Sequence, residues 1–253
     1  MKWRYLFRAF KAGYRDQKLE IALARAVIRK GDLVADVGAN KGAYLYWLRK
    51  SVGADGLVFA FEPQPRLAAY LNQMVPLMGW RNVVVRPIAI SESKGTQSLH
   101  VPGGGISPGA SLESSVLGEK GGETFDCVVS RLDDELRERG RLTFLKVDVE
   151  GHELSVFKGA VEIIKRDNPV ILFECEERHL VRHSVDDVFE HLKKAGYEGF
   201  FLTRRQLISL SNFEATLHQK RQKDRFWDEP DYFNNFLFTP RNFDLTKLVR
   251  FRE

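Results

Sequence analysis

The sequence has few cysteines and prolines and no long hydrophobic run. Its two cysteines, Cys127 and Cys175, are too few for a disulfide framework and belong to no cluster with metal-ligand spacing. With 9 prolines and 20 glycines in 253 residues, the chain is neither collagen-like nor disordered. No apolar run approaches the ~18 residues of a membrane-spanning helix. The N-terminal residues carry charges every few positions, unlike a signal peptide. We therefore expect a reduced, cytoplasmic protein.

The composition is that of a globular protein, with 43% hydrophobic and 29% charged residues. A net charge of +5 hides an uneven distribution. Residues 1–30 carry nine basic and two acidic residues, and residues 204–253 carry ten and seven. Residues 31–203 carry twenty basic and twenty-five acidic residues. A nucleic-acid enzyme would be basic across its working face, so we expect no nucleic-acid partner.

The N-terminal segment predicts a helix over residues 3–29. Four aromatic residues recur at helical spacing, with basic residues between them. This aromatic stripe consists of Trp3, Phe7, Phe10 and Tyr14. We expect the stripe to pack on the core. The alternative is peripheral contact of residues 1–18 with an anionic membrane surface. We assign residues 1–30 to a basic amphipathic helical extension and residues 31–253 to the main domain.

Strands alternate with helices through the main domain. Short apolar runs predict the strands, and longer amphipathic runs predict the helices. Strands are expected at residues 33–37, 57–61, 83–85, 88–90, 97–101, 142–147, 170–173, 200–202 and 235–238. Helices are expected at residues 43–52, 67–78, 153–165 and 186–195. This order predicts an α/β fold: a doubly wound, mostly parallel sheet with helices on both faces.

Residues 102–122 interrupt the alternation. They contain seven glycines and two prolines and show no apolar period. Long loops inside compact domains are usually lids or mobile connectors. We expect a mobile loop, and both a substrate lid and a plain connector remain open.

The first chemical signal is the stretch that begins at Asp36. A buried strand ends in this acid, and Gly38 and Gly42 shape the turn into a helix. The next strand ends at Glu62, 26 residues later, where an acid can accept hydrogen bonds from ribose hydroxyls. A dinucleotide fingerprint needs glycine where Asn40 stands. S-adenosylmethionine, which has no pyrophosphate, therefore suits the site better than NAD.

The second signal is a run of ionisable residues after the strand at 142–147. Asp148, Glu150, His152 and Glu153 lie within six positions. Such clusters serve acid/base or metal chemistry. Asp148 and Glu153 are alternatively acids at a helix N-terminus, and His152 is alternatively a helix cap.

Together the two signals resemble the FkbM-type family of S-adenosylmethionine-dependent methyltransferases. The matching stretches include DVGANKGAYL (36–45), VFAFEPQP (58–65), LKVDVEGHELSVFKGA (145–160), PVILFE (169–174) and NFLFTP (235–240). Over residues 31–240 the resemblance implies a Rossmann-like, seven-stranded sheet with an antiparallel last strand. It also implies O-methylation of a hydroxyl on a sugar, glycolipid or secondary metabolite.

The resemblance also implies roles for individual residues. The methionine end of S-adenosylmethionine is expected at four of them. These are Asp36, Gly38, Ala39 and Asn40. Glu62, followed by Pro63, is expected at the ribose, Ala89 at the adenine, and Asp148 beside the methyl group.

A methyl transferase must hold the acceptor oxygen in line and remove its proton. We expect His152 to be the base, Asp148 to position the acceptor hydroxyl and Glu150 to support the site. In an alternative mechanism, Mg²⁺ bound by Asp148 and Glu174 lowers the acceptor pKa. No metal site is assigned.

Two other functions remain open. A non-catalytic scaffold would bind the cofactor and attach a complex to a membrane through the basic N-terminus. A dinucleotide-dependent oxidoreductase is disfavoured by Asn40.

Overall fold

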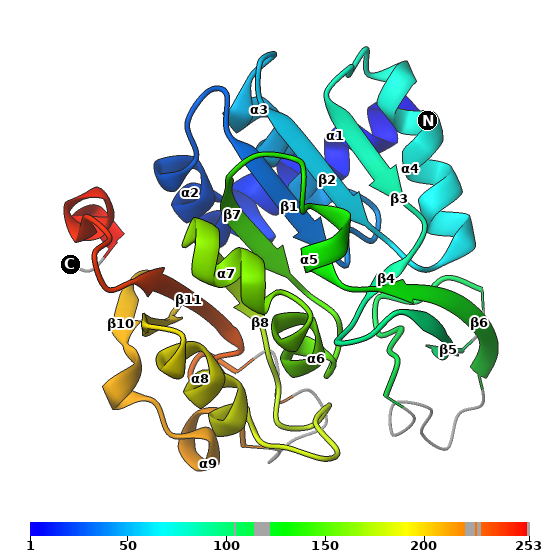
Figure 1. Ribbon diagram of the computed structural model, residues 1–253. Coiled ribbons are helices and arrows are strands. Elements are labelled where there is room, and N and C mark those ends of the chain that lie inside the picture. The colour runs from blue at the N-terminus through cyan, green and yellow to red at the C-terminus, as the bar shows by residue number, and fades with distance from the viewer. Residues whose placement is uncertain (104, 114–121, 221–225, 227–228, 252–253) are drawn as a thin grey trace.

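The computed structural model describes residues 1–103, 105–113, 122–220, 226 and 229–251. Within these residues the main sheet has eight strands, in the order β3-β2-β1-β7-β8-β11-β9-β10 (Figure 1). Their bounds are β1 Leu33–Val37, β2 Leu57–Phe61, β3 Val83–Arg86, β7 Leu142–Val147, β8 Val170–Glu174, β9 Tyr197–Leu202, β10 Leu207–Ser209 and β11 Asn235–Pro240. Strands β3, β2, β1, β7 and β8 run parallel, and β11 is antiparallel to both of its neighbours.

The predicted α/β class is confirmed, but the predicted number of seven strands is wrong. The additional strand is β10, which pairs with β9 antiparallel at the edge of the sheet. It has three residues, too few for a hydrophobic period to be visible in the sequence. It lies in the segment that falls outside the family resemblance.

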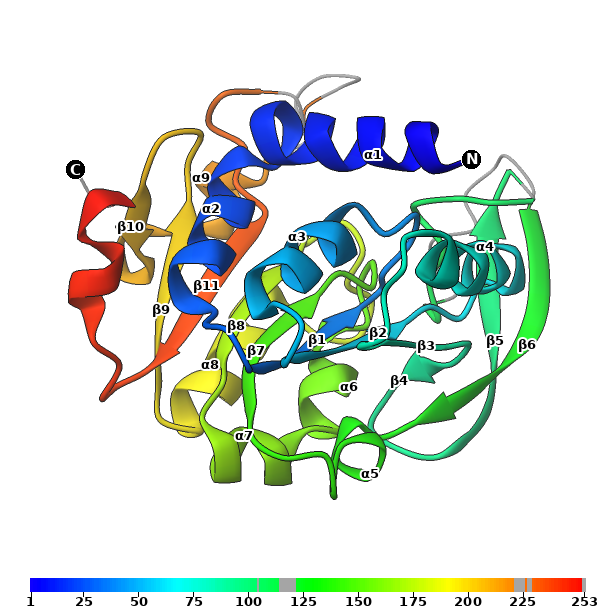
Figure 2. The same ribbon diagram turned by 90° about the horizontal axis from the view of Figure 1, so that it is seen from above.

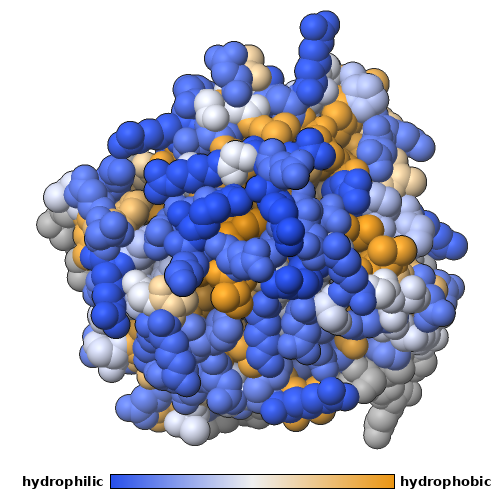
Figure 3. Space-filling view, in the orientation of Figure 1, coloured by the Kyte–Doolittle hydropathy of each residue, from blue (hydrophilic) through white to orange (hydrophobic). Residues whose placement is uncertain are grey.

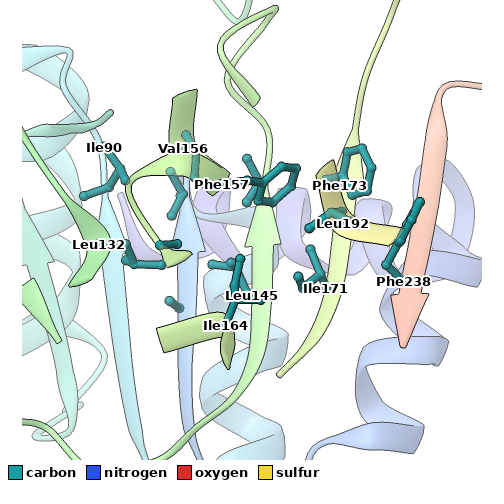
Figure 4. Close-up of a cluster of buried hydrophobic side chains, with 14 of the residues drawn as sticks. Ile90, Leu132, Leu145, Val156, Phe157, Ile164, Ile171, Phe173, Leu192 and Phe238 are labelled. Carbon is teal, nitrogen blue, oxygen red and sulfur yellow. The ribbon is translucent and has the colours of Figure 1, made fainter. Parts of the chain in front are cut away.

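One face of the sheet is covered by α6 Glu153–Lys158, α7 Val161–Asp167 and α8 Val185–Lys194. Their apolar side chains meet those of the central strands in one buried cluster (Figure 4). The predicted single helix over 153–165 is two helices. At Gly159 the backbone passes so close to Ser91 that an added Cβ would lie 2.0 Å from its carbonyl oxygen. The Asp133 carboxylate accepts the Ile163 amide at 2.9 Å, which starts the second helix.

The other face is covered by α2 Lys18–Val27, α3 Ala43–Val52 and α4 Pro65–Leu77. Helix α1, Lys2–Lys11, continues into one π-helical turn at Ala12–Asp16 and lies outside α3 (Figure 2). Two buried side chains fix it there. Tyr5 donates its hydroxyl to the Gly42 carbonyl at 2.8 Å, and Trp47 donates its indole N–H to the Ala9 carbonyl at 2.8 Å.

Helix α1 packs on the core, but not through the aromatic stripe. The buried face consists of Tyr5, Ala9 and Ala12. Trp3, Phe7 and Tyr14 are 83%, 70% and 66% exposed, and Phe10 is 38% exposed. The expectation that the stripe packs on the core is therefore wrong for Trp3 and Phe7, whereas the rings of Phe10 and Tyr14 keep contact with the buried Trp47. The opposite face is buried because Tyr5 donates to the Gly42 carbonyl and the small Ala9 lets its carbonyl accept the Trp47 indole N–H.

A smaller sheet contains β4 Ala89–Ile90, β5 Gly95–Pro102 and β6 Gly122–Ser130, in the order β4-β6-β5. The short elements that remain are α5 Leu132–Glu135, the 3₁₀ turn Leu210–Asn212, α9 Ala215–His218 and the 3₁₀ turn Leu245–Phe251. The predicted loop 102–122 connects β5 to β6. Residue 104 and residues 114–121 lie outside the described residues, so its mobility and its role as a lid stay predictions. No described helix is long and apolar enough to cross a membrane.

Candidate active site

A cavity of about 610 Å³ opens at the carboxyl ends of the central strands. Ligands of open α/β sheets bind at this edge, next to the point where the strand order reverses. Apart from Glu153, which is buried outside its lining, the cavity is lined by every residue that was predicted in the site. These are Asp36, Gly38, Ala39, Asn40, Glu62, Pro63, Ala89, Asp148, Glu150, His152 and Glu174. Residues far apart in the sequence thus share one cavity.

The turn after β1 places its backbone against the end of β7. Gly38 has φ of 83°, and a Cβ there would lie 1.8 Å from the Asp148 carbonyl oxygen. The amide of Asp148 in turn donates to the Val37 carbonyl at 2.9 Å. Only glycine fits this contact, which joins the two halves of the cavity floor.

Glu62 is held rigidly at the end of β2. Its two carboxylate oxygens accept the Asn40 amide at 2.7 Å and the Gln64 amide at 2.9 Å. The side chain is 2% exposed, and burial raises its pKa to about 7. Each oxygen keeps a lone pair for a ligand hydroxyl. Ribose hydroxyls, which donate to such a carboxylate, suit this position.

Asp36 ends β1 on the same side of the sheet. Burial raises its pKa to about 7, because the Lys146 ammonium only partly offsets the loss of solvation. Its Oδ2 is buried and has no hydrogen-bond partner among the described residues. A buried acceptor without a partner is costly, so a bound donor would stabilise it.

The opposite wall of the cavity is apolar. It is formed by β4 and β5 and by the described part of the loop 102–122. The lining side chains there are Ile88, Ala89, Ile90, Leu99, Ala110 and Leu112. A flat, weakly polar group such as adenine suits this wall.

The side chains at the ends of β7 and β8 form a charged cluster. Lys146 is buried, with Nζ 3.1 Å from Oδ2 of Asp148 and 4.7 Å from the centre of the Tyr44 ring. Burial, and then the charges of Asp148 and Glu150, raise the pKa of Glu174 well above its ordinary value. Lys146 had no predicted role. Lys146 and Asp148 are two residues apart, and on an extended chain such residues point to the same side. That spacing is the signal that could have identified Lys146.

Glu150 lies beside this cluster with φ of 51°, which is rare for a non-glycine residue. Its carboxylate lies 2.7 Å from Nδ1 of His179. Burial raises the pKa of Glu150, and the hydrogen bond from His179 opposes that shift. Glu150 is thus fixed by a partner that the sequence did not reveal.

Both ring nitrogens of His152 have partners. Nδ1 lies 2.9 Å from the Glu113 carboxylate, and Nε2 lies 3.0 Å from the Ser91 hydroxyl. The hydrogen bond from His152 lowers the pKa of Glu113. With Nδ1 donating, a neutral ring accepts the Ser91 hydroxyl at Nε2. His152 precedes α6 without a side-chain capping hydrogen bond, so the capping alternative lacks support.

The described part of the loop 102–122 is tied to the cavity. Ser111 donates its hydroxyl to the Glu150 carbonyl at 2.6 Å, and the Ser107 amide donates to the Gln64 side chain at 3.1 Å. With the contact between Glu113 and His152, these bonds hold the loop against the cavity wall.

The N-terminal helices also contribute side chains, which the sequence analysis did not anticipate. The lining residues from this segment are Arg8, Lys11, Ala12, Asp16, Gln17 and Glu20. Arg8 donates to the Tyr70 hydroxyl, and its Nε is buried without a partner among the described residues. The rim of the cavity is therefore partly cationic.

No group of three or more His, Cys, Asp or Glu side chains is arranged to hold a metal ion within the described part of the chain. Asp148 is paired with Lys146, and the Glu174 carboxylate accepts a hydrogen bond from the side-chain amide of Asn234 at 2.7 Å. The magnesium alternative stays a prediction.

The residues fit S-adenosylmethionine in three respects. Asp36 has an orphaned oxygen for a donor, Glu62 has spare lone pairs for ribose hydroxyls, and the wall around Ala89 is apolar for adenine. The cavity volume lies in the range of small-molecule sites.

Comparisons with known proteins agree with this geometry. The family model for the methyltransferase FkbM domain matches residues 36–198. A curated hexuronic acid methyltransferase, AglP of Haloferax volcanii, is 31% identical over 144 residues, which are 56% of this chain and 55% of that relative. The chain thus spans about half the length of that relative. The crystal structure of methyltransferase FkbM from Methylobacillus flagellatus KT has a TM-score of 0.52 at 17% identity, over 83% of this chain and 43% of that one. That likeness shows the Rossmann-like fold.

Proposed function

This chain belongs to the FkbM methyltransferase family, and we propose on that premise that it transfers a methyl group from S-adenosylmethionine to a hydroxyl of a sugar. One observation carries the proposal. Every residue expected at the cofactor or the acceptor lines the same cavity, at the carboxyl ends of β1, β2, β7 and β8.

The cofactor-binding residues are proposed to act as follows. Glu62 accepts hydrogen bonds from the ribose hydroxyls, and Ala89 and its apolar neighbours flank the adenine. Asp36 and the turn Gly38–Asn40 receive the methionine end. When bound, S-adenosylmethionine supplies an electrophilic methyl group. The protein must orient the acceptor oxygen and take its proton.

We place the acceptor hydroxyl beside the charged cluster of Lys146, Asp148 and Glu174. Asp148 is 28% exposed, so its carboxylate can accept the hydroxyl while Lys146 holds it in place. Glu174 is proposed as the base, because a carboxyl group with a raised pKa is a stronger base than an ordinary one.

His152 remains the competing base. To act as the base, His152 must release the Ser91 hydroxyl from its Nε2 and accept the acceptor hydroxyl there instead. Its other ring nitrogen, Nδ1, is held by Glu113. Glu174 needs no such exchange. In this mechanism His152 is a positioning residue that holds Glu113, and with it the loop, against the cavity.

An acidic sugar is the acceptor class that the rim favours. Arg8 and Lys41 line the cavity and carry positive charge, whereas Lys11 is paired with Asp16 at 3.2 Å. A sugar carboxylate would form charge-assisted hydrogen bonds with such side chains. The relative named as a hexuronic acid methyltransferase supports the same class.

The test is a panel of acceptors incubated with S-adenosylmethionine labelled on the methyl group. Hexuronic acid glycosides, neutral hexosides and polyketide alcohols are compared, and mass spectrometry locates the new methyl group. We expect O-methylation, with higher kcat/KM for hexuronic acids than for neutral sugars. Equal rates would overturn the acidic class but not sugar methylation.

Two results would overturn the function itself. Binding of NAD in place of S-adenosylmethionine would favour the oxidoreductase alternative. Binding of S-adenosylmethionine without transfer to any member of the panel would favour the non-catalytic scaffold.

A further inference from the structure

We propose that the outer face of α1 binds an anionic membrane surface. This face presents the aromatic stripe of Trp3, Phe7, Phe10 and Tyr14, with Trp3 83% exposed and Phe7 70% exposed. Soluble monomers rarely expose large apolar side chains side by side, and such patches mark interaction sites. The inference does not depend on the proposed reaction.

The stripe is presented by a fixed element. On the opposite side of α1, Tyr5 and Ala9 are 1% and 0% exposed. The rings of Phe10 and Tyr14 lie edge-on to Trp47, with centroids 5.9 and 5.7 Å away. The helix therefore does not need to turn over to offer its aromatic face, and it loses little conformational freedom on binding.

Charge selects the partner. Lys2, Arg4, Lys11 and Arg15 are exposed on the same helical segment. Residues 1–18 carry six basic side chains against the single acid Asp16. Basic side chains beside exposed Trp and Phe are the chemistry of helices that lie in the interface of an anionic bilayer. A second copy of this chain would place like charges opposite one another, so the charge disfavours a dimer through this face.

Helix α1 lies next to the cavity, so membrane contact through α1 would bring the cavity close to the lipid. Arg8 and Lys11 belong both to this segment and to the rim of the cavity. A protein that rests on lipid through α1 therefore brings the cavity close to the surface. The face on the other side of the sheet, which carries α6 to α8, is mostly hydrophilic with small separate apolar patches (Figure 3).

The experiment is co-sedimentation of the full chain with lipid vesicles. One set contains phosphatidylcholine alone, and the other contains phosphatidylcholine with phosphatidylglycerol. We expect binding to the anionic vesicles and at least tenfold weaker binding to the neutral ones. Binding to the anionic vesicles should weaken in 0.5 M salt, because the Debye length then falls to about 3–5 Å. The double variant Trp3→Ala, Phe7→Ala should bind anionic vesicles at least tenfold more weakly than the unmodified protein.

The matched control is Val128→Ala, Val181→Ala, which trims two side chains that are 56% and 52% exposed elsewhere. It should bind like the unmodified protein. Melting temperatures of all variants should agree within a few degrees, since each altered side chain is exposed. Unchanged vesicle binding by the stripe variant would overturn the proposal. So would a concentration-dependent dimer, seen in sedimentation velocity, that the stripe variant abolishes.

Discussion

The ammonium of Lys146 lies 3.1 Å from a carboxylate oxygen of Asp148, two residues further along the chain at the end of β7. Lys146 is 2% exposed, so its charge has little contact with solvent. A buried charge persists only when it is paired. Burial lowers the pKa of Lys146, but the charges of Asp148, Asp36 and Glu174 outweigh it, so the pKa is raised. Lys146 therefore interacts both with Asp36, proposed at the cofactor, and with Asp148 and Glu174, proposed at the acceptor.

The first prediction concerns this cation. Lys146→Met removes the charge that offsets the neighbouring carboxylates, so we expect the pH optimum of kcat to move upward. The free energy of unfolding should fall by about 1–3 kcal/mol, since Asp148 is left without its partner but is partly solvated. The matched control is Lys158→Met, because the Lys158–Glu92 pair is 3.6 Å apart and exposed. It should change stability by less than about 0.5 kcal/mol. Equal effects of both changes would contradict the assignment.

The second prediction separates the two candidate bases. If Glu174 is the base, Glu174→Gln should lower kcat by roughly 10²–10⁴. The unmodified protein should lose activity as the pH falls through the raised pKa of Glu174, because the base must be ionised. His152→Gln should reduce kcat less than about tenfold and keep the pH profile. A loss of 10² or more for His152→Gln, with Glu174→Gln nearly active, would restore His152 as the base.

The fold was predicted well where strands are buried on both faces. The bounds of β1, β2 and β7 were predicted to the residue, because each mainly apolar run is followed directly by an acid or a glycine. Strand β6, Gly122–Ser130, was missed entirely, since no strand was predicted between residues 101 and 142. Its first five residues alternate little in burial, since they lie at an exposed edge. The periodic signal was therefore absent there.

The site was predicted as a set of residues but not as a set of contacts. Every predicted site residue except Glu153 lines the cavity. The partners of His152, Glu113 and Ser91, come from other elements 39 and 61 residues away, so no local pattern encodes them. The aromatic stripe was placed wrongly for a related reason. The sequence shows two apolar lines on α1, and only the packing decides which of them is buried.

The third prediction concerns pH and stability. Glu153 is fully buried, its Oε2 has no hydrogen-bond partner among the described residues, and burial raises its pKa to about 7. The folded state then binds a proton more tightly than the unfolded state. The contribution of Glu153 to the free energy of unfolding is thus fully present below pH ~4.5 and is lost as the pH rises towards 7. Glu153→Gln should remove this loss, with the variant about 2–3 kcal/mol more stable at pH 8 and similar at pH 4.5. Denaturant melts at both pH values measure it. Parallel pH dependence of the two proteins would contradict the pKa assignment.

The fourth prediction concerns the floor of the cavity. Gly38→Ala should abolish cofactor binding and destabilise the fold, because its Cβ would meet the Asp148 carbonyl oxygen at 1.8 Å. Gly79→Ala is the matched control, since Gly79 also has a positive φ, of 70°, but open space around it. That control should cost only about 1–2 kcal/mol of backbone strain. Urea melts and cofactor titrations of both variants give the comparison. Similar costs would show that the contact with Asp148 is not tight.

The central claim is that the cavity binds S-adenosylmethionine through Glu62, and isothermal titration calorimetry tests it most directly. We expect the unmodified protein to bind the cofactor with one site per chain. Glu62→Ala should weaken binding by about 1–3 kcal/mol, because the ribose hydroxyls lose their acceptor. Glu138→Ala, at an exposed position away from the cavity, should leave the affinity unchanged. An affinity of Glu62→Ala equal to that of the unmodified protein, or no binding by the unmodified protein, would contradict the account.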